Sequence, residues 1–454
     1  MPYVSLNPAT NQAIQTYASW DTGRLEQALE KAHCAQQAWA QTSFVQRAEV
    51  LRNAALHLHA QRDRYAALIT LEMGKLLREA RAEVEKCAGV CDYYAQHAED
   101  FLHAEPVESD AGNSYVAYYP LGVLLAVMPW NFPFWQVFRA AAPALMAGNA
   151  VVLKHAANVP QCALALEAIF CDSGMPEGLF TTLMIDAGQV AEAIASPHVH
   201  AVTLTGSEAT GRKVAACAGQ HLKKCVLELG GSDPFIVLRD ADLELAADMA
   251  VASRFLNCGQ SCIAAKRFIV MPQIADEFLH RIKTKVEALK LGDPMEDATQ
   301  IGPMARIDLR EALHSQVTDS IAQGAVAVTG CIPVEREGFF YQPSILDRVT
   351  AKTRAWHEEL FGPVAIVIRA ASEADALRIA NETRFGLGSS IWSNDMARAE
   401  QLAAHLQAGC TFINGIVKSD PRLPFGGVKA SGYGRELSRP GIHEFVNAKT
   451  VWIR

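Results

Sequence analysis

The chain has 454 residues, of which 50% are hydrophobic and 20% charged, and its formal net charge is -8. This length and composition predict a globular enzyme of two or three domains. The mildly acidic balance argues against nucleic acid and anionic membranes as partners. The eleven cysteines lack the density of a secreted disulfide framework and predict reduced thiols in the cytosol.

Several other classes of protein find no support in the sequence. The first residues contain no basic region followed by an apolar run, so we expect no signal peptide. No uncharged apolar run reaches the roughly 18 residues that a membrane helix needs. No Cys-x-x-Cys or His-x-x-x-His pair occurs, so we expect no metal site.

The first part of the chain changes from helices to alternating strands and helices. From about residue 22 to residue 102, apolar side chains keep a period near 3.6, which predicts helices. Further along, short apolar runs predict strands at 115–119, 122–128, 151–154 and 201–205, with helices at 134–147 and 162–173. This alternation predicts a parallel, doubly wound α/β sheet.

A second set of elements begins near residue 230. Strands are expected at 235–238, 267–271 and 363–368, and helices at 243–252, 274–289 and 374–381. These predict a second α/β domain, which the Gly- and Pro-rich stretch 424–434 closes. The apolar terminal segment 445–454 has little chain left to cover it, which suggests pairing with another subunit.

A cysteine and a glutamate carry the strongest chemical signal. Cys262 ends the segment Asn257-Cys-Gly-Gln-Ser-Cys, and Glu228 lies 34 residues upstream in Leu-Glu-Leu-Gly-Gly. A thiol nucleophile with a carboxylate base suits oxidation of an aldehyde through a thioester. A lone buried cysteine is more often a small core residue. Cys258, four residues earlier, is either a redox partner of Cys262 or, more simply, a structural neighbour.

Two turns next to predicted strands are candidates for ligand binding. Gly206 and Ser207 lie in a glycine-containing turn between a strand and a helix, where backbone N–H groups can bind a pyrophosphate. The turn is not Gly-x-Gly-x-x-Gly, so a plain structural turn is the alternative. Asn131 lies between two prolines after the 122–128 strand, where its side chain can donate to an oxyanion. A structural turn residue is again the alternative.

Five ordered motifs together resemble the aldehyde dehydrogenase superfamily over nearly the whole chain. They are Pro129–Pro133, Leu227–Gly231, Gly259–Cys262, Glu359–Pro363, and Pro424–Gly427 with Ser431-Gly432. The resemblance implies a Rossmann-type cofactor domain, a second α/β catalytic domain and a small β oligomerisation ribbon. The implied bounds are 1–101 with 121–229, 230–431, and 102–120 with 445–454. A homodimer or homotetramer is expected.

The resemblance also implies the chemistry. Cys262 attacks the aldehyde, Asn131 and the Cys262 backbone N–H bind the oxyanion, and Glu228 activates water to hydrolyse the thioester. The implied cofactor is NADP or NAD. Its implied binding residues are Pro129, Trp130, Lys154, His155, Ala157, Gly206, Ser207, Leu229, Glu359 and Phe361. Ala157 stands where relatives often carry a glutamate, so a 2′-phosphate is not repelled. His155 either favours that phosphate or is simply a surface residue.

Arg139 indicates which class of aldehyde is the expected substrate. It lies four residues after Trp135 on a predicted helix, and relatives that act on succinate semialdehyde carry an arginine at this position. A buried arginine needs an anion, so the substrate is expected to carry a distal carboxylate. The alternative is an ion pair between Arg139 and a neighbouring acid.

The rest of the predicted substrate tunnel is less specific. Some of these relatives carry a second arginine six residues before the nucleophile, where this chain has Leu256. Lys418 or Arg422 is a candidate to complete the clamp, and Phe425 is expected to line the tunnel with Trp135. A broad-specificity aldehyde dehydrogenase is the alternative enzyme. A cofactor-binding protein without turnover is the alternative outside enzymes.

Overall fold

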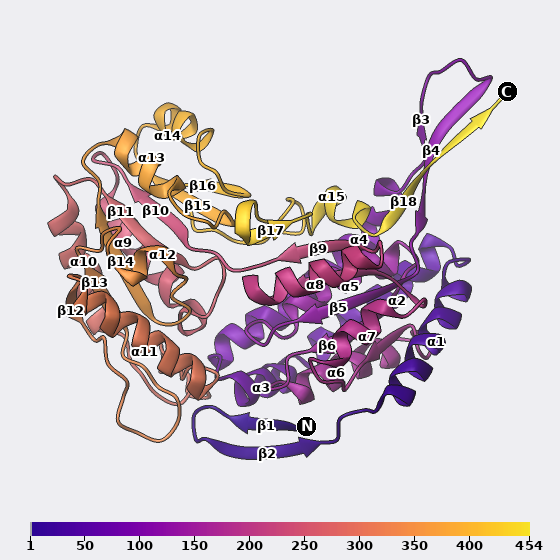
Figure 1. Cartoon of the computed structure of the whole chain (residues 1–454), viewed down its shortest axis with the longest axis horizontal. Coiled ribbons are helices and arrows are strands. Elements are labelled where there is room, and N and C mark those ends of the chain that lie inside the picture. The colour runs from indigo at the N-terminus through magenta and orange to yellow at the C-terminus, as the bar shows by residue number, and fades with distance from the viewer. Residues whose placement is uncertain (1) are drawn as a thin grey trace.

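Two sheets covered by helices form the body of the protein, and a narrow β ribbon projects from it (Figure 1). The computed structural model describes residues 2–454. Within these residues, no helix combines the length and the apolar character that crossing a bilayer requires.

The first sheet has six strands in the order β17-β9-β8-β5-β6-β7 and is parallel except where β17 joins β9. Its strands are β5 (Val123–Met128), β6 (Ala150–His155), β7 (Phe180–Thr182), β8 (Val199–Thr205), β9 (Lys224–Glu228) and β17 (Gly432–Tyr433). The helices between them are α5 (Trp135–Met146), α6 (Pro160–Asp172), α7 (Gln189–Ala195) and α8 (Glu208–Gln220). The near-continuous apolar sequence of β5 and β6 reflects burial on both faces.

An N-terminal hairpin and four helices precede this sheet in the chain. The hairpin, which the sequence analysis missed, pairs β1 (Tyr3–Asn7) with β2 (Gln12–Tyr17). The helices are α1 (Thr22–Trp39), α2 (Phe44–Ala60), α3 (Arg62–Met73) and α4 (Leu77–Phe101). Helix α4 contacts α2, α3 and α5, so it extends from the outer helices to the sheet.

The second sheet has seven strands in the order β12-β13-β14-β11-β10-β15-β16, of which the sequence analysis expected three. Its strands are β10 (Asp233–Val237), β11 (Ala265–Val270), β12 (Val326–Thr329), β13 (Ser344–Asp347), β14 (Val364–Arg369), β15 (Gly388–Trp392) and β16 (Cys410–Ile413). The helical elements are α9 (Leu243–Phe255), η1 (Leu256–Gly259), α10 (Ala275–Glu287), α11 (Ile307–Ala322), α12 (Arg354–His357), α13 (Glu373–Asn381), α14 (Met396–Ala403), η2 (Lys429–Ser431) and α15 (Ser438–His443).

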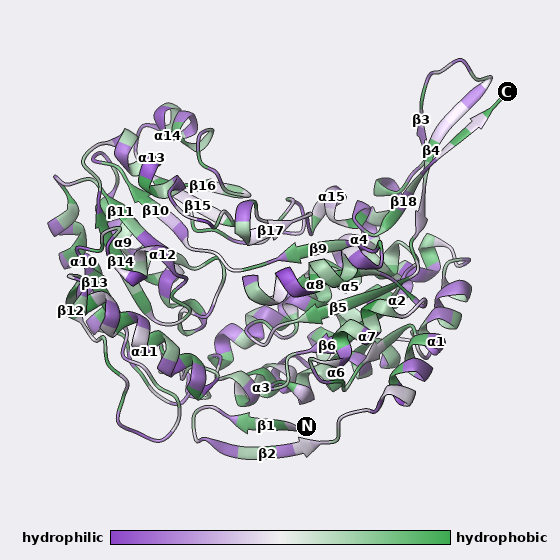
Figure 2. Ribbon diagram, viewed as in Figure 1, coloured by the Kyte–Doolittle hydropathy of each residue, from purple (hydrophilic) through white to green (hydrophobic). Residues whose placement is uncertain are grey.

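Each sheet has its own hydrophobic core. In Figure 2 the hydrophobic residues gather on the central strands, such as β5 and β10, while hydrophilic residues mark outer helices such as α14. The chain returns from the second core to the first through β17, which pairs with β9 next to Glu228. The two bodies therefore meet close to the predicted catalytic base.

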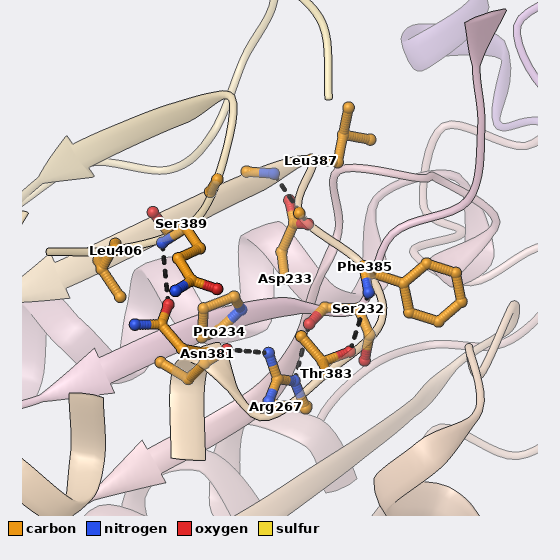
Figure 3. Close-up of a pocket in the computed structure, with 15 residues that line it drawn as sticks. Ser232, Asp233, Pro234, Arg267, Asn381, Thr383, Phe385, Leu387, Ser389 and Leu406 are labelled. Atoms are coloured by element: carbon orange, nitrogen blue, oxygen red, sulfur yellow. Dashed lines mark hydrogen bonds between the residues drawn. The ribbon is translucent and has the colours of Figure 1, made fainter. Parts of the chain in front are cut away.

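A buried arginine fixes the start of the second sheet (Figure 3). Arg267 donates to the carbonyls of Ser232, Ile379 and Ala380 at 2.8–2.9 Å. Asp233 accepts the Gly388 N–H at 3.0 Å. The space between these residues, about 10 Å³, holds at most one water. This region is a structural joint between β10, α13 and β15, and it leaves no room for a ligand.

The projecting ribbon is an antiparallel sheet of three strands, β3 (Glu105–Pro106), β4 (Asn113–Pro120) and β18 (Val446–Ile453). Figure 1 shows it extending from the body, with the C-terminus at its tip. Trp452 and Ile453 are 50% and 47% exposed on it. Large apolar side chains with this exposure favour an interface.

Candidate active site

The loop that carries Cys262 has an unusual backbone. Asn257, Cys258 and Gly259 all lie in the left-handed region, with φ of 53°, 54° and 70°. Non-glycine residues rarely adopt this conformation. A Cβ on Gly259 would overlap the carbonyl oxygen of Gly362, so the tight approach requires glycine. The Cys258 side chain is buried in the second core, which supports its interpretation as a structural neighbour.

A fully buried arginine holds this loop in place. The guanidinium of Arg254 donates to the carbonyls of Gly259 and Leu360 at 2.9 and 3.1 Å, and to the carbonyl of Gly362. It therefore ties the nucleophile loop to the Glu359–Pro363 segment. No local sequence pattern indicates this role of Arg254.

Four of the five predicted motifs line one cavity of about 250 Å³ between the two cores, whereas Glu228 and the motif at 424–432 are not among its lining residues. It is lined by Pro129, Trp130, Asn131, Gln136, Thr205, Gly206, Ser207, Leu229, Gly230, Cys262, Leu309, Glu359 and Phe361. Nine of these were predicted. Gln136, Thr205, Gly230 and Leu309 were not predicted as site residues.

Cys262 lies half-buried at this cavity. Burial raises the pKa of its thiol to about 12, against the opposing charges of Lys266 and Arg139. Lys266 donates to the carbonyls of Ser261 and Cys262 at 2.9 and 2.8 Å and lies 3.2 Å from the carboxylate of Glu359. The resting thiol is therefore protonated at neutral pH.

Two hydrogen bonds hold the Asn131 side chain, and one of its N–H groups remains without an acceptor among residues 2–454. Its side-chain nitrogen donates to the Gln260 carbonyl at 3.0 Å, and its oxygen accepts from Gln136 at 3.1 Å. An amide nitrogen carries two hydrogens. The second N–H of Asn131, together with the Cys262 backbone N–H, has no acceptor among residues 2–454. Both are available to an oxyanion at the cavity.

Glu228 ends strand β9 and is buried, with only 2% exposure. Neither carboxyl oxygen has a hydrogen-bond partner among residues 2–454. Burial raises its pKa well above the usual range, the negative charge of Glu436 raises it further, and Arg139 opposes the rise. A carboxyl with a raised pKa and no fixed partner suits reversible proton transfer to water.

Arg139 has an anionic partner inside the protein. Its guanidinium forms an ion pair with Glu436, donates to Thr205 at 3.3 Å and lies 4.9 Å from the centre of the Phe425 ring. This ion pair is the alternative that the sequence left open for Arg139, and a role for Arg139 in binding a substrate carboxylate stays a prediction. Glu436 sits beside Glu228 because β17 pairs with β9, a long-range contact that the sequence did not indicate.

Replacing Glu436 with glutamine should lower the pKa of Glu228. The change removes the negative charge that raises this pKa and leaves the positive charge of Arg139. Since a base works only when deprotonated, the acidic limb of the kcat–pH profile should move to lower pH. An unchanged limb would show that Glu436 does not act on Glu228. The control is Glu444→Gln, because Glu444 is a partly exposed acid that pairs with Lys224 at 3.1 Å.

The cofactor side of the cavity is built around the start of α8. Ser207 caps this helix by accepting the Thr210 N–H at 3.3 Å. The N–H groups of Glu208 and Ala209 have no acceptor among residues 2–454. Free N–H groups at a helix start fit the pyrophosphate of a dinucleotide. Lys154 is half-buried at the end of β6 and Ala157 is exposed just beyond it.

His155 does not have either role expected of it. It is 2% exposed, its Nε2 lies 2.9 Å from the Pro133 carbonyl, and its Nδ1 accepts the Ala156 N–H at 2.9 Å. Burial lowers its pKa to about 4. Side chains alternate between the two faces of the sheet along β6, so the buried His155 and the half-buried Lys154 lie on opposite faces. Both ring nitrogens are occupied, so the prediction that His155 contacts the cofactor was wrong.

The substrate side includes one cation that the sequence analysis missed. Trp135 is buried and donates from Nε1 to the Ser419 hydroxyl at 3.1 Å. Lys86 of α4 donates to the same hydroxyl at 2.7 Å. Lys418 has an exposed side chain, and Arg422 pairs with Asp420 at the surface. Arg422 is therefore not free to complete a clamp, and Lys418 stays a prediction.

Comparisons with known proteins agree with this geometry. The aldehyde dehydrogenase family model matches residues 2–451. The chain belongs to this family. It is 50% identical to a probable succinate-semialdehyde dehydrogenase (NADP+) of Synechocystis sp., with all of both chains covered. It is 48% identical to succinate-semialdehyde dehydrogenase (NADP+) 1 of Mycobacterium tuberculosis, again over the full length of both.

A solved structure of an aldehyde dehydrogenase relative has the same fold as this chain. The succinic semialdehyde dehydrogenase of Streptococcus pyogenes, determined with NADP+, superposes with a TM-score of 0.98 at 38% identity. The superposition covers 99% of each chain. The predicted family and the predicted α/β fold are confirmed.

Proposed function

We propose that this aldehyde dehydrogenase oxidises succinate semialdehyde to succinate with NADP as its preferred cofactor. The observation that carries the proposal is the meeting of Cys262 and Asn131 at one cavity, with Glu228 buried at the end of β9 under the influence of the Arg139 charge. The names of the full-length relatives support the same substrate and cofactor.

Each of the three site residues has a separate role in the reaction. The Cys262 thiol loses its proton to solvent as its sulfur attacks the aldehyde carbon, and the free N–H groups of Asn131 and Cys262 bind the oxygen that becomes negative. A nicotinamide cofactor, held by the residues described below, would supply the acceptor for the hydride of this carbon. The resulting thioester on Cys262 is hydrolysed by a water whose proton passes to Glu228. The oxygen of water stays on the acyl carbon, the carbon–sulfur bond breaks, and the proton on Glu228 passes to the Cys262 sulfur, so succinate leaves and both the thiol and the carboxylate are restored.

The cofactor residues fit a dinucleotide with a 2′-phosphate. The free N–H groups at the start of α8 would hold the pyrophosphate, and Trp130 and Phe361, whose rings are 5.8 Å apart, would border the nicotinamide. Lys154 is three residues before exposed Ala157, which offers no carboxylate to repel a 2′-phosphate. The predicted roles of Pro129, Gly206, Ser207, Leu229 and Glu359 remain part of this proposal.

The test compares kcat/KM for succinate semialdehyde and butanal at saturating NADP. Butanal has the same number of carbons without the carboxylate. The proposal expects a preference for succinate semialdehyde of about a hundredfold, the scale of a charge-assisted anchor. Comparable values would overturn it and favour the broad-specificity alternative.

We further propose that the ribbon joins subunits into a homodimer or homotetramer in the cytosol. Support comes from the exposed Trp452 and Ile453 and from eleven free thiols, which a reducing compartment preserves. We keep the domain division 1–101 with 121–229, 230–431, and the ribbon at 102–120 with 445–454. Replacing Trp452 and Ile453 with serine should lower the mass measured by light scattering. An unchanged mass would contradict a role for these residues in assembly.

A further inference from the structure

Helix α4 contacts both segments that form the proposed oxyanion site, through two acids that have no role in the chemistry above. Glu79 and Glu83 are four residues apart, so their side chains lie on the same face of α4, about one turn from each other. Glu79 is half-buried and Glu83 is 4% exposed. Each accepts hydrogen bonds from the backbone of a different segment.

Glu83 holds the turn that carries Asn131 (residues 129–133, here the Asn131 turn). One carboxylate oxygen of Glu83 accepts the N–H groups of Phe134 and Trp135 at 2.9 and 3.0 Å. These N–H groups stand at the start of α5, where no carbonyl of the helix can accept them. The helix dipole also favours a carboxylate at this end. Glu83 therefore fixes the start of α5, three residues after Asn131.

A buried lysine just before α4 fixes Glu83. Lys75 is 1% exposed and forms an ion pair with the second carboxylate oxygen of Glu83. The ammonium of Lys75 also lies 3.7 Å from the centre of the Phe132 ring, and Phe132 follows Asn131 in the chain. Lys75 and Glu83 together therefore hold the Asn131 turn at two points.

Glu79 holds the nucleophile loop. Its carboxylate accepts the Asn257 N–H at 3.0 Å. Asn257 lies in the left-handed region, with φ of 53°, and such a backbone persists only when its surroundings support it. Burial raises the pKa of Glu79 to about 7, against the charge of Lys75 and the hydrogen bond from Asn257. The Asn257 N–H is therefore a partner of the carboxylate form of Glu79.

The two segments are also joined directly. The Asn257 side chain donates to the Asn131 carbonyl at 2.8 Å, and the Asn131 side chain donates to the Gln260 carbonyl at 3.0 Å. Helix α4, the Asn131 turn and the nucleophile loop thus form a closed triangle of hydrogen bonds. Such a triangle fixes the distance between the Asn131 side chain and the Cys262 backbone N–H.

We propose that Glu79 and Glu83 are positioning residues that set the geometry of the oxyanion site from α4. This inference rests on the proposed roles of Asn131 and Cys262 and adds the residues that hold their two N–H donors in register. Such donors stabilise a transition state when they are already aimed at the place where negative charge develops. Loss of either contact should therefore lower kcat and leave KM close to that of the parent.

The first test is Glu79→Ala, with Glu79→Gln as rescue and Glu85→Ala as control. Glu85 lies on the same helix, is partly exposed and pairs with Arg62 at 3.2 Å. In Glu79→Ala, kcat with succinate semialdehyde and NADP should fall by about tenfold to a hundredfold, with KM within about twofold. Glu79→Gln keeps an acceptor for the Asn257 N–H and should recover most of this loss. The control should match the parent.

Glu83 is tested together with Lys75, because removing one partner would leave the other charge buried alone. Lys75→Met with Glu83→Leu removes the acceptor of the Phe134 and Trp135 N–H groups, and kcat should fall by about tenfold or more. Lys75→Met with Glu83→Gln keeps an acceptor oxygen and should recover most of the loss. Equal kcat values in these two double variants would overturn the role of Glu83.

A double-mutant cycle separates positioning from a general loss of structure. Asn131→Ala should itself lower kcat by about a hundredfold to a thousandfold. Adding Glu79→Ala should then cost about threefold at most, because one of the two donors that Glu79 keeps in register is already absent. If Glu79→Ala costs the same factor with and without Asn131, Glu79 acts independently of the oxyanion site and the inference is overturned.

The remaining outcomes distinguish this inference from the proposals on which it rests. An unchanged kcat in Glu79→Ala, or a loss that Glu79→Gln does not recover, would overturn the inference alone. Parent-like kcat in Asn131→Ala would overturn the proposed role of Asn131 and the inference with it. Equal kcat/KM for succinate semialdehyde and butanal in the parent would overturn the proposed substrate and leave the inference intact, because both aldehydes form an oxyanion.

Discussion

Replacing Cys262 with alanine should lower kcat by about four orders of magnitude or more, because no covalent intermediate can form. Cys262 is the cysteine that lines the cavity with Asn131 and Glu359. Reduction of NADP in the presence of succinate semialdehyde is the measurement. Binding of NADP, followed by quenching of tryptophan fluorescence, should be retained, since alanine removes only the sulfur.

The matched control for this variant is Cys162→Ala. Cys162 is also a free thiol, but it is fully buried on α6 in the first core. Its loss should cost about 1 kcal/mol of stability and leave the kinetics close to those of the parent. Appreciable turnover by Cys262→Ala would disprove the thioester route and require a different nucleophile.

Replacing Arg254 with leucine should be the most destabilising change outside the reacting groups. Arg254 is fully buried and serves the carbonyls of Gly259, Leu360 and Gly362. Leucine leaves these acceptors buried without a donor. The free energy of unfolding should fall by about 3–5 kcal/mol. Activity should fall as well, because the nucleophile loop and the Glu359 segment lose their connection.

Urea unfolding at fixed protein concentration measures this effect. Arg281→Leu is the control, because Arg281 is partly exposed and pairs with Glu244 and Glu277 on the surface. Surface pairs of this kind contribute about 1 kcal/mol or less. If the two variants unfold at the same urea concentration, Arg254 does not hold the site together.

The family and fold could be predicted from the sequence because their signals are local. The segments around Asn131, Glu228 and Cys262 place special residue types at turns next to apolar strands. The structure brings Asn131 and Cys262 to one cavity, with Glu228 on the strand that leads to it. The apolar run of β5 likewise predicted a strand almost to its bounds.

The remaining features depend on contacts between distant segments. The pairing of Arg139 with Glu436 and the meeting of Lys86 with Ser419 each join residues about 300 apart in the chain. The local sequence around each of these residues gives no indication of which distant residue it contacts. His155 was misjudged for a different reason, since the end of a buried strand places alternate side chains in the core and outside.

Strands with weak apolar patterns were also missed. β15 begins with glycine and two serines and is nevertheless fully buried, so its sequence looks like a loop. β12 is an exposed edge strand of four residues with no alternation to detect. Both are defined by neighbouring strands, β10 and β13, rather than by their own composition.

The most direct test of the catalytic account is the intact mass of Glu228→Gln after reaction with succinate semialdehyde and NADP. The variant can form the thioester but has no base to hydrolyse it. We predict one added succinyl group per chain, located by peptide mapping on Cys262, and about one equivalent of reduced cofactor. Sustained turnover without an adduct, or an adduct on another residue, would contradict the assigned roles of Glu228 and Cys262.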